Sequence, residues 1–343
     1  MAQDASSDIA ATAAPRNGCC GGSSFFGRPA GVEAIEPLTL PTTFPNGARA
    51  AVMMTYDVEG FYGNGAGSEA LEIRNYSRLA ERLSALGLKA TFNVVGRMAE
   101  EKGPEFVRLL HQAGMELATH GYDHEMDREG DGFTYHGHYG LKENLEDLGR
   151  GMEALQAITG VPVRGARLPY GHFNEHSYRA MERLGLAWAS NMEIDNFLHP
   201  ECAFGPAPFR PAIGGKACDL VEIPLDSQTY DWAMWIADEK NPSFVERVNA
   251  FMQSRGLHAP RTPAGAATVW EERIRATVEG ESVFTLLCHP INLTVRSERW
   301  SGDPMEEFMF RVLDRLAALQ KERKLWAPTC SEMADFYLAQ KAK

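Results

Sequence analysis

The sequence predicts an α/β protein whose parallel strands form a barrel. Short apolar runs, typical of buried parallel strands, alternate with segments whose apolar residues recur at helical spacing. About seven or eight strands are expected, and their regular alternation with helices favours a barrel over an open sheet. The chain has 343 residues, which permits two domains but also fits one barrel.

The first expected strand covers residues 48–56, a mostly apolar run that reads ARAAVMMTY. A helix follows over residues 68–86, because Ser68 supplies an N-cap, leucines recur at helical spacing and Gly87 ends the segment. The same alternation predicts further strands at residues 88–95, 115–119, 163–168, 187–190, 220–224, 282–288 and 325–329. It predicts further helices at residues 100–113, 141–158, 175–184, 243–254, 266–279 and 306–320.

Residues 1–47 are expected to form an arm that is partly flexible or contacts another subunit, and residues 48–343 a single barrel domain. The arm suggests a homo-oligomer, since a free tail of this length otherwise stays disordered. Its apolar piece at residues 9–14 is too short and too weak for the hydrophobic region of a secretory signal. Because the six cysteines form no disulfide pattern, we expect a cytoplasmic protein in which the adjacent Cys19 and Cys20 are inert or, less often, bind a metal.

Charge and hydrophobicity exclude several classes of protein. Asp and Glu number 46 against 34 Lys and Arg, and the formal net charge of −12 argues against nucleic acid or an anionic membrane as a partner. Apolar residues make up 44% of the chain, which is enough for a sizeable core. No stretch approaches the ~20 apolar residues of a membrane span. An acidic, enzyme-sized α/β protein remains.

Ionisable residues collect where the expected strands end, which is where α/β barrels carry their chemistry. His120 and His124 follow the third strand four residues apart, a spacing that lets two imidazoles face one ion. Asp57 or Glu59, after the first strand, would complete a set of two histidines and one carboxylate that leaves positions for water and substrate. Later strand ends carry Arg167, Tyr170, Asp231, Trp232 and His289.

Each of these patterns also has a purely structural interpretation. Two histidines at this spacing are more often a surface or packing pair than a metal site. Arg167 and Asp231 could form a structural ion pair at a strand end. The catalytic interpretation is favoured because five separate strand ends each carry a residue type used in hydrolysis. Trp188 is expected in the core, and His136 and His138 in a lid or a solvated loop.

In this order, the motifs resemble those of the polysaccharide deacetylases of carbohydrate esterase family 4, the NodB-homology domain. The resemblance covers about residues 48–335. The T-F-D-D motif of the family is matched by Thr55-Tyr56-Asp57-Val58-Glu59, and its H-[ST]-x-x-H motif by His120-Gly121-Tyr122-Asp123-His124. The R-x-P-[YF] motif is matched by Arg167-Leu168-Pro169-Tyr170. The D-W element is matched by Asp231-Trp232, and the L-x-H motif by Leu287-Cys288-His289.

Two departures from the family's pattern bear on the substrate. The acidic pair is D-x-E instead of adjacent D-D, and Gly121 stands where Ser or Thr is usual. Both departures resemble the branch that contains intracellular peptidoglycan-deacetylase-like proteins, allantoinase-like enzymes and cyclic imidases. Since members of that branch attack small non-peptide amides and imides as well as, or instead of, sugars, the resemblance favours a small soluble substrate over a polysaccharide.

The resemblance further implies a deformed (β/α) barrel of about seven parallel strands around one divalent ion. The ion is usually Zn²⁺, with Co²⁺, Mn²⁺ or Ni²⁺ as alternatives. Glu59, His120 and His124 would be its ligands. Asp57 would be the general base that takes the proton of the attacking water. The D-x-E spacing leaves open that Asp57 and Glu59 exchange these two roles.

The remaining motif residues receive roles from the same resemblance. Arg167 would fix the carboxylate of the base, and the backbone N–H of Tyr170 would help to hold the oxyanion. His289 would protonate the leaving nitrogen, while Asp231 would orient His289 and favour its protonated form. The substrate pocket would be lined by Trp232, Phe61, Tyr62 and Pro169.

These residues predict a metal-dependent hydrolase of non-peptide C–N bonds, acting on a small soluble amide, cyclic imide or N-acyl compound. One alternative is an N-deacetylase of N-acetyl-sugar oligomers or peptidoglycan. Another is a metal-binding scaffold without activity. The presence of both a base and an acid among the motifs counts against the scaffold.

Overall fold

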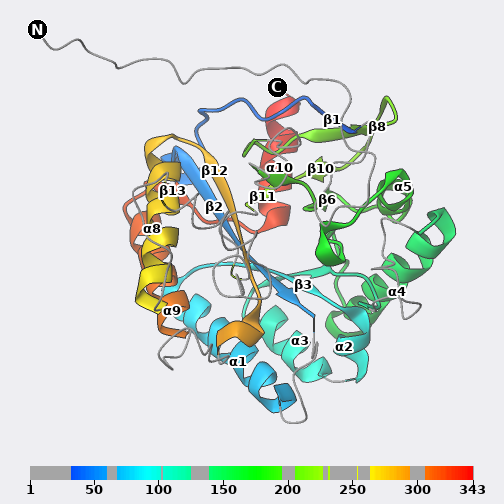
Figure 1. The fold of residues 1–343 in the computed structure, drawn as a ribbon, viewed down its shortest axis with the longest axis horizontal. Helices are drawn as coiled ribbons and strands as arrows, with labels where there is room; N and C mark the ends of the chain where they lie inside the picture. Colours follow the sequence, from blue (N-terminus) through cyan, green and yellow to red (C-terminus); the bar gives the residue numbers. More distant parts are fainter. Residues whose placement is uncertain are drawn as a thin grey trace, which may run out of the picture.

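A computed structural model describes most of the chain and shows how its strands and helices are arranged (Figure 1). The described residues are 32–59, 68–101, 103–124, 139–194, 205–226, 231, 253, 263–293 and 306–342.

The main sheet is parallel throughout and curls into a half-barrel (Figure 1). Among the described residues no ladder joins its two end strands, which makes this a deformed barrel and confirms the predicted fold class. Its seven-strand path runs, in spatial order, through β10 (Val221–Glu222), β6 (Trp188–Ala189), β5 (Gly165–Ala166), β4 (Glu116–Thr119), β3 (Thr91–Val94), β2 (Ala50–Val58) and β12 (Val283–Cys288). An eighth strand, β13 (Leu325–Trp326), pairs with the start of β2.

Strand β2 is central to this sheet and is buried along its whole length. It pairs with β12 from Ala51 to Tyr56 on one edge and with β3 from Thr55 to Val58 on the other. Because both faces are covered, the strand shows a continuous apolar run instead of an alternating pattern. Its last residues carry the first acidic motif to the carboxyl end of the sheet.

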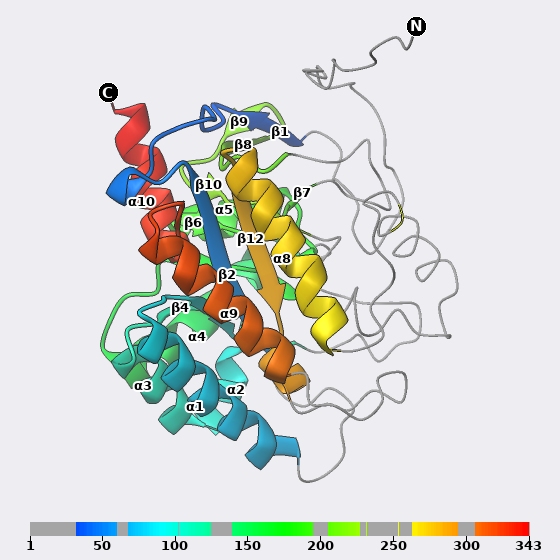
Figure 2. The ribbon, with the colours of Figure 1, turned by 90° about the vertical axis from the view of Figure 1, so that its left-hand side faces the viewer.

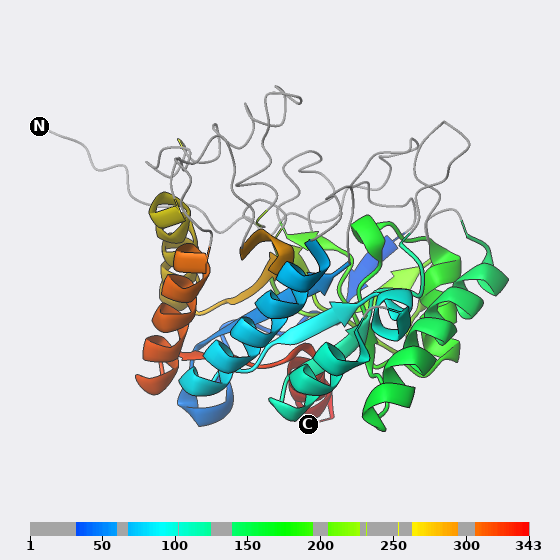
Figure 3. The ribbon, with the colours of Figure 1, turned by 90° about the horizontal axis from the view of Figure 1, so that it is seen from below.

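Helices cover the outside of the sheet, and the blue to teal helices α1 to α3 lie in front of the strands in Figure 3. Helices α8 and α9 lie side by side along β2 and β12 (Figure 2), where the rings of Trp270 and Phe308 pack with centroids 4.4 Å apart. The described helices are α1 (Ser68–Leu86), α2 (Gly96–Glu101), α3 (Pro104–Gln112), α4 (Leu141–Thr159), α5 (Glu175–Arg183), α8 (Pro263–Glu279), α9 (Glu306–Lys321) and α10 (Cys330–Lys341). Within the described residues no helix is long and apolar enough to cross a bilayer.

The predicted and observed helices differ at two places, and a third predicted helix lies outside the described residues. The single helix expected at residues 100–113 is wrong, because Gly103 and Pro104 separate α2 from α3 and Pro is well suited to the first turn of a new helix. Helix α10 was not predicted, although Thr329 and Glu332 form a reciprocal capping box at its start. The helix expected at residues 243–254 lies outside the described residues, apart from Gln253.

Two small sheets flank the barrel. Strand β1 (Val32–Ile35) pairs antiparallel with β8 (Arg210–Ile213), which continues to β9 (Lys216–Ala217), and β11 (Leu225–Asp226) pairs with β7 (Glu193–Ile194). Residues 32–47 of the expected arm therefore pack on the barrel, with Leu38 and Phe44 at most 4% exposed.

Candidate metal centre and active site

The polar motif residues meet at the carboxyl ends of the parallel strands. Asp57 lies within β2, and Glu59 is the first residue after the end of that strand. His120 follows β4, Arg167 follows β5 and His289 follows β12. Because these strands are parallel neighbours, residues up to 232 positions apart in the chain come together at one edge of the sheet.

The carboxylate of Glu59 lies at the centre of three histidines. Its Oε1 is 3.3 Å from Nε2 of His120, 3.3 Å from Nε2 of His124 and 3.4 Å from Nε2 of His289. Burial raises the pKa of Glu59, but the charges of His289 and His124 and hydrogen bonds from the rings outweigh burial and hold this pKa well below its ordinary value. Glu59 is therefore a carboxylate at neutral pH.

His120 is held in the tautomer that a metal ligand needs. The ring is 1% exposed, and its Nδ1 lies 2.7 Å from the carbonyl oxygen of Arg167. A carbonyl only accepts, so Nδ1 carries a hydrogen and donates it, and Nε2, on the Glu59 side of the ring, is the nitrogen that would bind an ion.

His289 is oriented by Asp231, which is fully buried. Its Nδ1 lies 2.8 Å from Oδ1 of Asp231, and its backbone N–H donates to the other oxygen of the same carboxylate. Burial alone would lower the pKa of His289, but the carboxylates of Asp231 and Glu59 raise it well above its ordinary value. The imidazole is therefore kept in the protonated form that a general acid requires.

Asp57 is bound through one oxygen only. Its Oδ1 accepts from Nη1 of Arg167 at 3.0 Å and from Nδ2 of Asn93 at 2.7 Å, and no described residue donates to Oδ2. Arg167 is 2% exposed and also donates to the hydroxyl of Thr55 and to the carbonyl and hydroxyl of Ser190. The partner of Arg167 is thus Asp57 and not Asp231, so the alternative of a structural Arg167–Asp231 pair is wrong.

Three of these supporting residues were missed from the sequence. Asn93 was detectable, because it is a polar residue inside the apolar run LKATFNVV. Its Cα is paired with that of Asp57 across β2 and β3, which explains the short hydrogen bond. Thr55 stands in the first acidic motif but was given no role, and Ser190 gave no signal, since hydroxyl residues are common in strands.

The motif that begins at Arg167 continues into a short 3-10 turn over Pro169–Gly171. The residue before it, Leu168, donates its N–H to Oδ1 of Asn191 at 2.7 Å. Asn191 in turn donates its own N–H to the buried carboxylate of Glu222 at 2.7 Å. Pro169 is buried beside this network. The predicted pocket residues Trp232, Phe61 and Tyr62 lie outside the described residues, as do His136, His138, Cys19 and Cys20.

Gly121 departs from the family's usual Ser or Thr for a conformational reason. Its φ is +76°, in the left-handed region that favours glycine. We expect Gly121→Ser to lower the free energy of unfolding of the metal-free protein by about 1–2 kcal/mol. Chemical denaturation measures this value, with Gly149→Ser as the control, because a Cβ on Gly149 meets its nearest atom only at 3.7 Å. Equal stability of the two variants would contradict the expectation.

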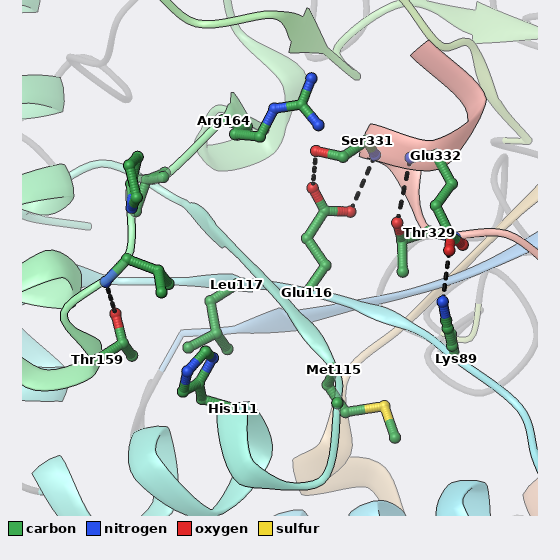
Figure 4. A pocket seen from close by; sticks show the side chains of 14 residues that line it. Lys89, His111, Met115, Glu116, Leu117, Thr159, Arg164, Thr329, Ser331 and Glu332 are labelled. Carbon is green, nitrogen blue, oxygen red and sulfur yellow. Dashed lines mark hydrogen bonds and ion pairs between the residues drawn. The ribbon is translucent and has the colours of Figure 1, made fainter. Parts of the chain in front are cut away.

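A cavity of about 280 Å³ lies at the other end of the barrel, near the starts of β3, β4 and β5 (Figure 4). Its charged groups are already paired: Glu116 accepts from the N–H of Ser331 at 3.0 Å and from Nε1 of the core residue Trp188 at 3.1 Å. Arg164 binds both oxygens of Asp335 at 2.6 and 2.9 Å. None of the predicted site residues lines this cavity, so the chemistry belongs to the carboxyl ends of the strands.

The donor set at those strand ends fits a divalent cation. One atom each of Glu59, His120 and His124 lie within 4.8 Å of one another, and Asp57, Glu59 and His289 form an overlapping group. Imidazole nitrogen together with carboxylate oxygen suits zinc and similar ions. A barrel that carries such a donor set beside a buried carboxylate and a protonated histidine defines the class of metal-dependent hydrolases.

The comparisons with known proteins agree with this class. Residues 46–189 match the model of the polysaccharide deacetylase family. Members of this family are hydrolases that act on C–N bonds and use a divalent metal ion, and the donor set described above agrees with that chemistry.

Solved structures show the same fold. A Mycobacterium smegmatis protein assigned to the polysaccharide deacetylases is 23% identical, with a TM-score of 0.63 over 89% of this chain and 96% of that one. A Pseudomonas aeruginosa PAO1 protein with the same assignment is 14% identical, with a TM-score of 0.58 over 85% of this chain and 92% of that one. At these identities the likeness establishes the fold only.

Proposed function

We propose that this chain is a metal-dependent hydrolase that cleaves a non-peptide C–N bond in a small soluble amide, cyclic imide or N-acyl compound. The observation that carries the proposal is the position of Glu59 Oε1, 3.3–3.4 Å from Nε2 of three histidines, next to an aspartate held by a buried arginine. Glu59, His120 and His124 would hold the ion. When bound, the ion supplies Lewis acidity to the attacking water and to the scissile carbonyl.

Asp57 is proposed as the general base. Arg167 and Asn93 both donate to its Oδ1, so its Oδ2 can accept the proton of the attacking water. Glu59 is favoured as the metal ligand, because its Oε1 lies 3.3 Å from Nε2 of both His120 and His124. The roles of base and ligand are therefore assigned to Asp57 and Glu59 respectively.

His289 is proposed to donate its Nε2 proton to the leaving nitrogen. Asp231 holds Nδ1 at 2.8 Å, which directs Nε2 towards Glu59 and the reacting centre. The backbone N–H of Tyr170, in the turn after Leu168, is proposed to donate to the oxyanion. The hydrogen bond of Leu168 to Asn191 anchors the start of that turn.

A small substrate is supported by the D-x-E spacing, which resembles the branch acting on small amides and imides, and by the net charge of −12, which disfavours anionic glycans. Deacetylation of N-acetyl-sugar oligomers is the second candidate, because the family match covers residues 46–189 and is named for polysaccharide substrates.

An assay panel with metal-loaded protein tests the proposal. We expect turnover of at least one compound among allantoin, dihydropyrimidines, succinimide and phthalimide, with chitooligosaccharides unchanged. Turnover of the oligosaccharides alone would reverse the choice of substrate. Protein inactivated by replacing Asp57 serves as the control for contaminating hydrolases.

We also propose a cytoplasmic homo-oligomer with one barrel domain. The cysteines within the described part of the chain, Cys218, Cys288 and Cys330, are free and buried, in accord with a reducing compartment. Cell fractionation and light scattering test the two parts of this proposal. Recovery in the extracellular fraction, or a monomer at micromolar concentration, would contradict them.

A further inference from the structure

We infer that Asp147 is a positioning residue that sets the spacing of His120 and His124 for metal binding. Asp147 lies on α4 and accepts hydrogen bonds from the backbone of Tyr122 and Asp123. It acts on the turn of residues 121–123, which joins the two histidines. The inference rests on the proposed function, in which both histidines bind the ion.

The carboxylate of Asp147 binds two successive backbone N–H groups of this turn. Oδ2 accepts from the N–H of Tyr122 at 3.0 Å, and Oδ1 accepts from the N–H of Asp123 at 3.1 Å. Gly121, the residue before Tyr122, has a φ of +76°. A residue in this left-handed conformation turns the N–H groups that follow it towards one acceptor. An ionised carboxylate with two oxygens satisfies both donors at once.

The opposite side of the turn is held by helix α2. The carbonyl of Gly121 accepts from the N–H of Gly96 at 2.9 Å, and the carbonyl of Tyr122 accepts from the N–H of Arg97 at 2.9 Å. The first N–H groups of a helix have no partner within the helix, so they are available for this contact. The turn is therefore bound through its carbonyls by α2 and through its N–H groups by Asp147.

Glycine at position 151 allows α4 to reach the turn. A Cβ on Gly151 would stand 2.6 Å from the carbonyl oxygen of Gly121 and 2.4 Å from Oγ1 of Thr119. Asp147 precedes Gly151 by four residues and so lies on the same face of the helix. The close packing and the carboxylate contact thus come from one helix face directed at the turn.

The consequence for the metal site is geometric. His120 begins this turn and His124 ends it, and their Nε2 atoms both lie 3.3 Å from Oε1 of Glu59. If the N–H side of the turn is released, the backbone that carries the two rings can shift. Supporting groups of this kind change metal affinity by roughly 10–100-fold when they are removed.

The test compares Asp147→Ala and Asp147→Asn with Glu146→Gln, in the full chain. Glu146 is the matched control, because it is the neighbouring acid on α4, its side chain is 64% exposed and it pairs with Lys142. The dissociation constant for Zn²⁺ is measured by chelator competition. The visible absorption of the Co²⁺-loaded protein reports ligand geometry, and thermal unfolding without metal reports the stability of the fold.

We expect Asp147→Ala to bind Zn²⁺ roughly 10–100-fold more weakly and to change the Co²⁺ spectrum. Asp147→Asn keeps one acceptor oxygen and should lie between Asp147→Ala and the wild type, whereas Glu146→Gln should match the wild type. Should Asp147→Ala fail to fold, Asp147→Asn carries the same test.

Wild-type affinity and an unchanged Co²⁺ spectrum in a folded Asp147 variant would overturn the inference, even if the variant melts at a lower temperature. That result would show a merely structural role. Failure of the wild type itself to bind one ion per chain would instead overturn the proposed function, so the two failures can be distinguished.

Discussion

Asp57→Asn is expected to lower kcat by about 10²–10⁴-fold while the protein keeps its metal ion. Asparagine has the shape of aspartate, and its carbonyl oxygen can accept from Arg167 and Asn93 as Oδ1 does now. The NH₂ group then stands in the place of Oδ2 and cannot take a proton from water. Steady-state kinetics on the substrate found in the panel, together with metal analysis of the purified variant, measure both quantities.

Asp219→Asn is the matched control for this change, because its side chain is 90% exposed and lies outside the site. It should retain wild-type kcat. The companion variant Glu59→Gln should lose the ion, since an amide oxygen is a weaker ligand than a carboxylate. If Glu59→Gln keeps the ion and Asp57→Asn loses it, the roles of base and ligand are exchanged.

His120→Ala and His124→Ala are each expected to abolish stoichiometric metal binding and to reduce activity to background. Each removes one of the two imidazole nitrogens that lie 3.3 Å from Oε1 of Glu59. The loss should exceed the roughly 10–100-fold produced by groups that only support a ligand. Calorimetric titration with Zn²⁺ measures the effect in protein shown by circular dichroism to be folded.

The control for these variants is His176→Ala, whose side chain is 47% exposed on α5 and which belongs to none of the motifs. It should bind one ion with wild-type affinity. Full metal occupancy in either His120→Ala or His124→Ala would exclude that residue as a ligand.

The order of the main strands and helices could be predicted because it depends on local pattern. The run at residues 48–56 is apolar throughout, and the structure buries β2 on both faces. Helix α1 spans Ser68–Leu86, the range that the leucine spacing and Gly87 predict. Strands β1 and β8 were missed, because β1 lies in the segment expected to be an arm and β8 lies in a stretch rich in Pro and Gly.

The site residues that belong to motifs were predictable, and those that support them were mostly not. Glu59, His120, His124 and His289 do come together, as the motif order implied. Asn93 and Asp147 have no motif of their own. They contact the site only because β3 lies in register beside β2 and because α4 packs on the turn before it.

The sequence by itself therefore determined the class of fold, the end of the sheet that carries chemistry and the identity of the ionisable groups. Hydrophobic periodicity and motif order are properties of the chain alone. Only the tertiary structure decided that Arg167 binds Asp57, that Asp231 binds His289 and that one oxygen of Glu59 faces three imidazoles. These pairings depend on strand register and on how the curled sheet brings its carboxyl ends together, and neither is encoded in local spacing.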